Sequence, residues 1–238
     1  AAEPDNQRVR YYLGSVYAQT QEYGKAIEQL QRIDTDSEYY VDARIQLAAV
    51  YQRQDKTPAA IKEIEQALKA KPKNVELLAY LAALHREEKQ YSQAISILEQ
   101  AVSLEPDNDQ HVFSLGATYD EAKNKPKAIE MMERAIAINP QNAAALNYLG
   151  YTYAELGQHL DEAEKLIRRA LAIEPDDGFY IDSLGWVYYM RGDYPRAVEQ
   201  LERAIEHAGD DPTVTEHLGD AYEKSGKARD AIRVYQEA

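Results

Sequence analysis

Residues 149–175, LGYTYAELGQHLDEAEKLIRRALAIEP, contain the pattern that decides the fold of this chain. The stretch begins with Leu149 and Gly150 and places an aromatic residue, Tyr153, three positions after the glycine. Its second half carries small and aliphatic residues from Ala163 onward, and it ends at Pro175. Equivalent residues recur along the chain in steps of 34, with one step of 35. This regularity predicts a chain that is built from one repeated structural unit.

Two ladders of residues define the repeat. Each member of the first ladder is a leucine followed by a small residue: Leu13, Leu47, Leu81, Leu115, Leu149, Leu184 and Leu218. Each member of the second ladder is an alanine: Ala26, Ala60, Ala94, Ala128, Ala163, Ala197 and Ala231. The longer step falls between the two ladders of the fifth repeat, so we expect the extra residue in the turn at 157–161.

The spacing within a repeat predicts helices. Apolar residues follow Ala60 at intervals of one, four, seven and eight positions, and only a helix places those positions on one face. Pro72 stands just past this stripe, and proline followed by polar residues is typical of a helix stop and restart. Each repeat is therefore expected to form two antiparallel helices. One helix pair cannot bury both of its faces, so neighbouring pairs must share a core.

These ladders and prolines resemble the tetratricopeptide repeat family, from about residue 7 to the end of the chain. The resemblance implies an all-α, right-handed superhelical solenoid of antiparallel helix pairs. Two positions depart from the family pattern, because Glu38 and Gly209 stand where proline is usual, and the early tryptophan of the family is absent. The expected repeats are 7–40, 41–74, 75–108, 109–142, 143–177, 178–211 and a shortened seventh repeat, 212–238, preceded by 1–6.

The two ends suggest a longer array. Residues 3–6, EPDN, repeat the sequence of residues 105–108, so we interpret them as the tail of an upstream repeat. The chain stops at Ala238, before the polar helix that usually caps such arrays. We therefore expect this sequence to be cut from a longer protein.

The composition excludes several classes of function. The chain has 27 Lys and Arg against 41 Asp and Glu, which gives a net charge of −14 and argues against a nucleic acid or an anionic membrane as its partner. Its apolar runs are far shorter than the roughly 20 residues of a membrane-spanning helix. It has no cysteine, so it lacks disulfides, thiol nucleophiles and cysteine-ligated zinc.

We find no sequence motif that indicates catalysis. The phosphate-binding, dinucleotide-binding, hydrolase and zinc-protease signatures are absent. His85 replaces the recurrent tyrosine and is expected in the core, and the other four histidines are scattered. Adjacent acidic pairs such as Asp120 and Glu121 are expected to be solvated. The sequence therefore predicts that the chain is not an enzyme and binds neither a metal nor a cofactor.

The candidate binding surface is rich in aromatic residues. The resemblance places certain first-helix positions in a concave groove, where we expect partner-binding residues: Phe113, Asp120, Asn147, Tyr148, Tyr151, Phe179, Asp182, Trp186, Tyr189, Met190 and Asp220. Clustered Trp, Tyr and Met are common in protein-binding hot spots. The alternative is that these rings only pack between helices. The interleaved carboxylates favour a protein or peptide with Lys or Arg near an apolar anchor.

One known binding mode of the family can be tested on the residues. Family members that bind the C-termini of chaperones share a carboxylate clamp, a set of Lys, Asn and Arg side chains on three successive repeats. The matching positions here hold Tyr11, Ser15, Gln46, Glu76 and Tyr80. The sequence therefore disfavours recognition of a C-terminal carboxylate.

We expect a non-catalytic scaffold for protein partners. The sequences at 149–154 and 181–189 also resemble bacterial tetratricopeptide lipoproteins and envelope scaffolds, some of which recruit C-terminal processing proteases. That resemblance implies an adaptor in the periplasm or attached to the outer membrane, and a cytoplasmic location is the alternative. Two other hypotheses remain: the substrate-recognition arm of a longer enzyme, and a structural array that self-associates.

Overall fold

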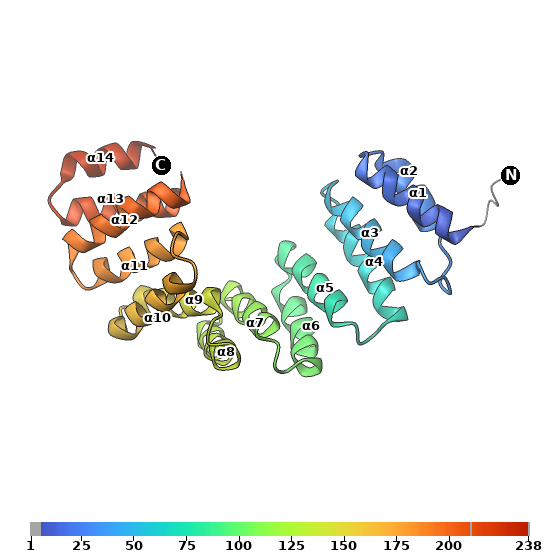
Figure 1. The fold of residues 1–238 in the computed structure, drawn as a ribbon, viewed down its shortest axis with the longest axis horizontal. Coiled ribbons are helices and arrows are strands. Elements are labelled where there is room, and N and C mark those ends of the chain that lie inside the picture. Colours follow the sequence, from blue (N-terminus) through green and yellow to red (C-terminus); the bar gives the residue numbers. More distant parts are fainter. Residues whose placement is uncertain (1–5, 210, 238) are drawn as a thin grey trace. The chain divides into compact units, whose positions relative to one another are not determined.

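A computed structural model describes residues 6–209 and 211–237 and consists there of helices and turns, with no strand (Figure 1). The predicted all-α fold is confirmed. The chain divides into two compact units, residues 1–124 and 125–238. The first unit contains α1 (Gln7–Gln19), α2 (Tyr23–Gln31), α3 (Tyr40–Gln52), α4 (Thr57–Ala70), α5 (Val75–Glu87), α6 (Tyr91–Leu104) and α7 (Asp109–Glu121). The second unit contains α8 (Lys125–Ile138), α9 (Ala143–Glu155), α10 (Leu160–Ile173), α11 (Gly178–Met190), α12 (Tyr194–Ala208), α13 (Pro212–Lys224) and α14 (Ala228–Glu237).

Side-chain caps start the first helix of most repeats. The Asn142 side chain accepts a hydrogen bond from the backbone N–H of Ala145 at 2.9 Å. Asp177 accepts from Phe179 at 2.9 Å and from Tyr180 at 3.0 Å. These bonds satisfy backbone donors that a helix start leaves free. The polar residue after each recurrent proline is thus the signal that starts the next helix.

The turn inside each repeat contains one residue with a left-handed backbone. This residue recurs in the same repeat position, at Gln21, Asp55, Lys89, Lys123, Gly157, Gly192 and Gly226. Only the last three are glycine, which adopts this conformation without strain. The extra residue of the fifth repeat lies in this turn, where His159 is also left-handed, with a φ of 50°. The longer step is therefore absorbed outside the helices.

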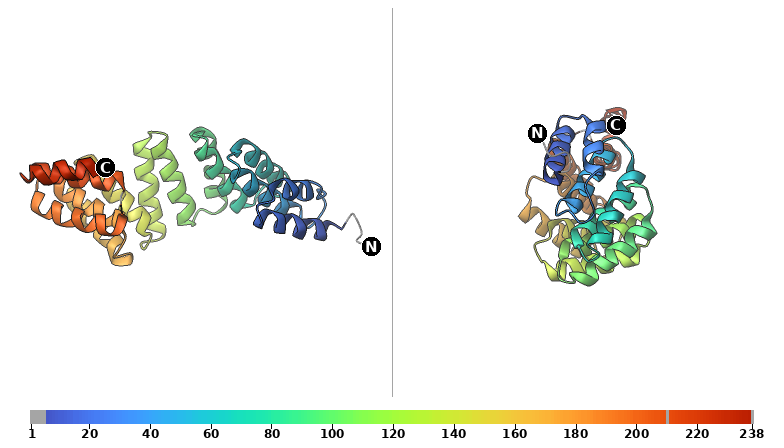
Figure 2. Two further views of the ribbon diagram at one scale, coloured as in Figure 1. Left: turned by 90° about the horizontal axis from the view of Figure 1, so that it is seen from above. Right: turned by 90° about the vertical axis from the view of Figure 1, so that its right-hand side faces the viewer.

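Within each unit, successive helices pack side by side (Figure 2). Glycines lie where some of these helices approach most closely. A Cβ atom added to Gly150 would lie 2.6 Å from Ile167 and 3.0 Å from the backbone oxygen of Ala163. Gly150 therefore lies where two helices approach too closely for a side chain. The recurrent tyrosine adds a polar contact to the second helix of the preceding repeat, because Tyr119 donates to Glu99 and Tyr222 donates to Glu202, each at 2.7 Å.

Replacing Gly150 with leucine should overpack this seam. The new side chain would have to displace Ile167 or part α9 from α10, which should cost about 1 to 3 kcal/mol of the free energy of unfolding. Thermal and urea unfolding would measure the loss. A matched change at Gly24, whose added Cβ meets no atom within 4 Å, is the control for loss of a helical glycine. Equal stability of wild type and Gly150→Leu would contradict the proposed seam.

The first unit contains a buried ion pair that the sequence did not reveal. Arg44 on α3 donates to Glu63 on α4 at 2.8 Å, and both side chains are about nine-tenths buried. The guanidinium also lies over the ring of Tyr40, with its carbon 4.7 Å from the ring centroid. The Arg44 Nε atom has no hydrogen-bond partner in the described part of the chain. Each charge therefore depends on the other for its stability in the core.

Candidate partner-binding surface

The first helices of the second unit, α9, α11 and α13, lie side by side and carry nine of the predicted residues. Asn147, Tyr148 and Tyr151 lie on α9, Asp220 lies on α13, and the other five lie on α11. Phe113 and Asp120 lie on α7, in the first unit. We call the exposed side of α9, α11 and α13 the first-helix surface of the second unit.

The centre of this surface is an aromatic cluster formed by Tyr151, Trp186, Tyr189 and His217. The Trp186 ring stacks between two others, with its centroid 4.6 Å from that of Tyr189 and 4.1 Å from that of His217. Tyr151 lies beside His217, with 6.3 Å between ring centroids. The rings come from three successive repeats, so the cluster also joins those repeats together.

Asp182 has a different position from the one we expected. It is buried rather than facing a ligand, and its two carboxylate oxygens lie 2.9 and 3.1 Å from Nδ1 of His217. A carboxylate in an apolar environment needs such a partner, and His217, 35 residues away, supplies it. Asp182 therefore orients the His217 ring against Trp186 and is not available to a partner.

Two further candidates, Phe179 and Met190, lie at the two ends of α11. Phe179 is 53% exposed at the start of the helix. Met190 is half-buried at its end, near the turn at Gly157. Eleven residues separate them, which corresponds to roughly 16 Å along a helix axis. The structure therefore places Phe179 and Met190 at opposite ends of α11.

Carboxylates lie on the same three helices as the aromatic cluster. Glu155, Glu216 and Glu223 are exposed on the three first helices. Glu155 is paired with Lys125 at 3.2 Å, whereas Asp220 accepts a hydrogen bond from Tyr235 at 2.6 Å. Arg and Lys side chains are few on these helices, where Lys224 is the one cation within the span of α9, α11 and α13. The first-helix surface is therefore acidic as well as aromatic.

The tyrosines of the cluster stay neutral over the physiological range. Burial, together with the nearby charges of Glu155 and Asp182, raises the pKa of Tyr151 to about 12. Burial also raises the pKa of Tyr189, and Asp220 adds to the shift because a phenolate would be repelled by its charge. Both hydroxyl groups can therefore act as hydrogen-bond donors.

Two buried polar atoms on this surface have no partner in the described residues. They are the indole N–H of Trp186 on α11 and the amide oxygen Oδ1 of Asn147 on α9. A buried donor or acceptor without a hydrogen bond costs about 1 to 3 kcal/mol, so such atoms are uncommon in folded proteins. The surface thus offers one donor and one acceptor that the protein itself leaves unused.

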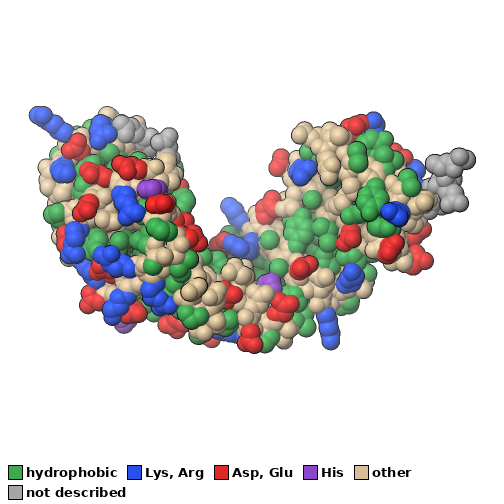
Figure 3. All heavy atoms as spheres, viewed as in Figure 1, with side chains coloured by type: hydrophobic (Ala, Val, Ile, Leu, Met, Phe, Trp, Pro, Cys, Tyr) green, Lys and Arg blue, Asp and Glu red, His purple; other side chains and the backbone are tan. Residues whose placement is uncertain are grey.

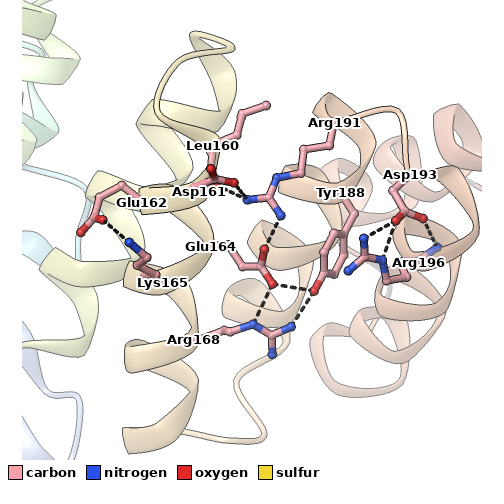
Figure 4. Close-up of polar contacts among 10 residues, drawn as sticks. All are labelled: Leu160, Asp161, Glu162, Glu164, Lys165, Arg168, Tyr188, Arg191, Asp193 and Arg196. Atoms are coloured by element: carbon pink, nitrogen blue, oxygen red, sulfur yellow. Dashed lines mark hydrogen bonds and ion pairs between the residues drawn. The ribbon is translucent and has the colours of Figure 1, made fainter.

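A polar network beneath the surface fixes α11 to α10 (Figure 4). Arg191, next to Met190, donates to the backbone oxygen of Leu160 at 2.9 Å and to Asp161 at 2.7 Å, and it also pairs with Glu164. Glu164 in turn accepts from Arg168 and Tyr188, each at 2.9 Å. In other repeats a glutamate of the preceding second helix, such as Glu99 or Glu202, accepts the hydrogen bond of the recurrent tyrosine. Arg168 stands at that position here, and Glu164 accepts the hydrogen bond of Tyr188 instead.

This network predicts a defined pH dependence of stability. Burial alone would raise the pKa of Glu164, but hydrogen bonds from Arg168, Arg191 and Tyr188 outweigh it and lower the pKa to about 2. Because the pKa of Glu164 is lower in the folded state, its ionised carboxylate stabilises the fold at pH values above its ordinary pKa of 4.5. This stabilisation is lost as the pH falls towards 2.

Glu164→Gln should therefore unfold with a flatter pH dependence between pH 4.5 and pH 2 than the wild type. Urea unfolding of both proteins at several pH values in this window would measure the difference. Glu162→Gln is a matched control, because Glu162 is exposed and forms only a surface pair with Lys165. Parallel curves for wild type and Glu164→Gln would contradict the assigned role of the network.

In the first unit, the predicted residues on α7 form different contacts. Phe113 and Asp120 are half-buried. The neighbouring Glu121, which we expected to be solvated, has a side chain that is 38% exposed and accepts two hydrogen bonds from Arg86, at 2.5 and 3.1 Å. Asp210, the first member of another acidic pair, lies outside the described residues.

The remaining polar expectations concern histidine and metal binding. His85 is buried, as predicted, and its Nδ1 lies 2.7 Å from the side-chain oxygen of Gln90. Among residues 6–209 and 211–237, no group of three or more His, Cys, Asp or Glu side chains could hold a metal ion. Nor is any described helix both long and apolar enough to span a membrane.

Comparisons with known proteins agree with this architecture. Residues 59–238 match the model of the C-terminal ARM domain of tetratricopeptide repeat protein 21, and residues 1–40 and 41–74 match two models of the tetratricopeptide repeat. The chain belongs to the tetratricopeptide repeat family. None of the curated proteins compared with it matches its sequence.

Solved tetratricopeptide structures are similar in fold. A tetratricopeptide repeat protein from Parabacteroides merdae shares 17% identity over 97% of this chain and 91% of its own, with a TM-score of 0.78. PilW, a type IV pilus biogenesis factor, shares 21% identity over 83% and 91%, with a TM-score of 0.72. MamA shares 26% identity over 76% and 97%, with a TM-score of 0.59.

Proposed function

We propose that this tetratricopeptide protein is a non-catalytic scaffold that binds a protein or peptide on the first-helix surface of its second unit. The observation that carries the proposal is the aromatic cluster around Trp186, which reaches across three helices, together with the exposed ring of Phe179 on the same helix, α11. Clusters of Trp and Tyr with an exposed aromatic neighbour are typical of binding hot spots.

The unused polar atoms of Trp186 and Asn147 suit a polypeptide ligand. A peptide main chain carries an acceptor for the indole N–H and a donor for the amide oxygen. A ligand would reach these buried atoms only if the two side chains rearrange on binding. Satisfying them on binding would relieve the cost of leaving them unpaired.

Electrostatics favour a partner with basic side chains. Glu155, Glu216 and Glu223 are exposed on the three helices that carry the aromatic cluster, and the whole chain carries a net charge of −14. Complementary charge accelerates association and disfavours acidic partners. We therefore propose a partner segment in which Lys or Arg alternates with aromatic or aliphatic residues.

The buried pair of Asp182 and His217 does not change this conclusion. A carboxylate that orients a histidine is also found in hydrolase triads, but there the histidine contacts a nucleophile. Within the described residues, no hydroxyl group bonds to His217, and the hydroxyl of neighbouring Ser183 donates to the backbone oxygen of Phe179 at 2.9 Å. Packing of the aromatic cluster accounts for the pair.

Phe179→Ala should weaken partner binding without unfolding the protein. Peptides selected from a random phage-displayed library on the full chain serve as the probe, and we expect them to combine basic with apolar residues. Loss of a hot-spot ring should lower affinity by about 2 kcal/mol, roughly 30-fold. Stability should change by about 0.5 kcal/mol or less, because the ring is exposed.

The matched control is Lys62→Ala with Lys69→Ala, two exposed residues on α4. It should leave peptide binding and the melting temperature unchanged. Selection of mainly acidic peptides, or unaltered binding by Phe179→Ala, would contradict the proposal.

We further propose that the scaffold is an adaptor of the bacterial envelope that recruits a processing protease. The support is the sequence at 149–154 and 181–189, which resembles lipoprotein scaffolds of that kind. Fractionation of cells that express the tagged natural protein would test the location, and co-purification of a periplasmic protease would test the partner. Recovery of the protein in the cytoplasm alone would contradict this assignment.

A further inference from the structure

A pocket with a volume of about 390 Å³ lies between α10, α11 and α12 in the second unit. Pockets of this size hold small ligands. None of the described residues that line it belongs to the aromatic cluster of the first-helix surface. We call it the arginine pocket, and the residues that determine its chemistry are Arg168, Leu171, Pro175, Leu184, Gln200 and Arg203.

The arginine pocket combines two exposed cations with buried apolar side chains. Arg168 on α10 and Arg203 on α12 both line it, and no Asp or Glu is among its described lining residues. Leu184 on α11 is buried, and Leu171 on α10 is half-buried. Several Lys and Arg side chains reach the surface over α10 and α12 (Figure 3). This combination suits an anion that carries an apolar group.

Hydrogen bonds from the protein hold both guanidinium groups in place. Arg203 donates from Nη2 to the backbone oxygen of Pro175 at 2.9 Å. Arg168 donates from Nε to Glu164 at 2.9 Å and from Nη2 to the Tyr188 hydroxyl at 2.6 Å (Figure 4). A guanidinium has five N–H donors, so each arginine keeps donors for a ligand. Because the groups are already positioned, a ligand binds them at a smaller cost in entropy.

The local charge of the pocket is not cancelled by its neighbours. Among the described residues, Arg203 forms no ion pair. The Glu164 carboxylate serves both Arg168 and Arg191 and also accepts from Tyr188, so one negative charge faces two guanidinium groups. The chain as a whole carries a charge of −14, but charges more than about 8 Å away are largely screened at physiological ionic strength. The pocket therefore attracts an anion although the protein is acidic.

The sequence departs from its own repeat at this pocket. Arg168 stands five positions after the ladder alanine Ala163. In the other six repeats the equivalent residue is Gln or Glu: Gln31, Glu65, Glu99, Glu133, Glu202 and Gln236. A residue of opposite charge thus stands at one place in the array, and it stands where it lines a pocket with a second arginine.

A pocket in the first unit shows what the ordinary repeat provides. It has a volume of about 450 Å³ and is lined by Pro72 and Gln100, which are the repeat equivalents of Pro175 and Arg203. Glu99 also lines it. The hollow is therefore a feature of stacked repeats, whereas the pair of arginines is specific to the arginine pocket.

We propose that the arginine pocket binds a small organic acid, in which one carboxylate is attached to a short aliphatic body. The two oxygens of a carboxylate match the forked donors of arginine. The aliphatic body would cover Leu171 and Leu184, which favours an organic acid over inorganic phosphate. This site is independent of the proposed peptide-binding surface, because the two share no residue.

Titration of the isotope-labelled full chain with 4-methylpentanoate, followed by NMR, would test the proposal. We expect saturable shifts of the backbone amide signals of Leu171, Ala172 and Gln200, with a dissociation constant on the order of 1 mM. The signals of the aromatic cluster should stay in place. Uncharged 4-methylpentanamide and inorganic phosphate should each bind roughly tenfold more weakly, because each lacks one of the two recognised features.

Two variants remove one guanidinium each and introduce a residue that this chain already uses at the same repeat position. Arg203→Gln follows Gln100, and Arg168→Gln follows Gln31, which still bonds its tyrosine. Each variant should bind 4-methylpentanoate roughly tenfold more weakly. Circular dichroism and thermal unfolding would verify that both variants fold.

Arg169→Gln is the matched control. Arg169 is an exposed residue of α10 and donates to the backbone oxygen of Pro140 at 3.0 Å, as Arg203 does to that of Pro175. It is not among the lining residues of the arginine pocket. Its replacement should leave binding of 4-methylpentanoate unchanged.

Four results would overturn the proposal. Absence of shifts at ten times the expected dissociation constant excludes the site. Equal binding of the amide or of phosphate shows that the charge or the aliphatic body is not recognised. Equal effects of Arg203→Gln and Arg169→Gln place the ligand elsewhere. Tighter binding of N-acetylglutamate α-amide than of 4-methylpentanoate indicates an acidic side chain of a protein instead of a small acid.

Discussion

Glu63→Ala is expected to destabilise the first unit by about 3 to 5 kcal/mol, among the largest effects of any single change in this chain. The reason is that Glu63 neutralises Arg44, which is about nine-tenths buried and cannot reach water without opening the core. The guanidinium would retain only its ring contact with Tyr40 and its weak bonds to backbone oxygens at 3.5 Å. Thermal and urea unfolding of the purified chain would measure the loss.

A double variant separates the charge effect from loss of packing. Arg44→Met with Glu63→Leu removes both charges and keeps the volume of the core, so its stability should be close to that of wild type or higher. If Glu63→Ala unfolds like wild type, the pair is hydrated in solution, which would contradict the buried contact described above.

Trp186→Ala is expected to cost about 3 kcal/mol of folding stability, near the lower end of the range for tryptophan truncation in a core. From the sequence we expected Trp186 and Tyr189 among the partner-binding residues, with packing between helices as the alternative. The structure places Trp186 between two rings and against the core, with its indole nitrogen buried. Removing it therefore leaves a cavity beside His217. Differential scanning calorimetry would measure the effect.

Trp186→Phe is the matched variant for this prediction. It keeps a ring between Tyr189 and His217, so we expect it to recover at least half of the lost stability. It removes the indole N–H, so the affinity for the selected peptides should still fall. A Trp186→Ala protein as stable as wild type would show that the stack is not formed in solution.

The repeat pattern was sufficient to predict the fold. The leucine and alanine ladders specify which residues face a neighbouring helix, and the seam contact of Gly150 with Ile167 follows directly from that register. Such contacts depend on residue size at a fixed spacing, which the sequence displays. The family could therefore be named from the residues alone.

Pairings between polar residues were not predictable in this way. Asp182 pairs with His217 of the next repeat, and Arg44 pairs with Glu63 of the next helix. Nothing in the sequence distinguishes these residues from polar residues that are exposed to solvent. Asp182 and His217 are 35 residues apart, one more than the 34-residue repeat, so they occupy different positions within their repeats and no repeated spacing links them. Their burial depends on how three repeats pack together, and that information is not local.

Exposure at the ends of the described array was also missed. Leu13 has the same sequence context as the other ladder leucines, so the pattern predicts a buried residue at 13. Burial requires a helix on each side, and among the described residues no helix precedes α1. Nor did the sequence distinguish Phe179, which is exposed, from the half-buried Trp186 and Tyr189 of the same helix.

The most direct test of the central claim uses the fluorescence of Trp186, the single tryptophan of the chain, which lies at the centre of the first-helix surface. A basic and apolar peptide selected on the full chain would be titrated into wild type, into Phe179→Ala and into the variant Lys62→Ala with Lys69→Ala. The account predicts a saturable change in emission at one peptide per chain, with roughly 30-fold weaker binding to Phe179→Ala and unchanged binding to the lysine variant. Peptide binding that leaves the Trp186 emission unchanged and is equally tight for Phe179→Ala would contradict it.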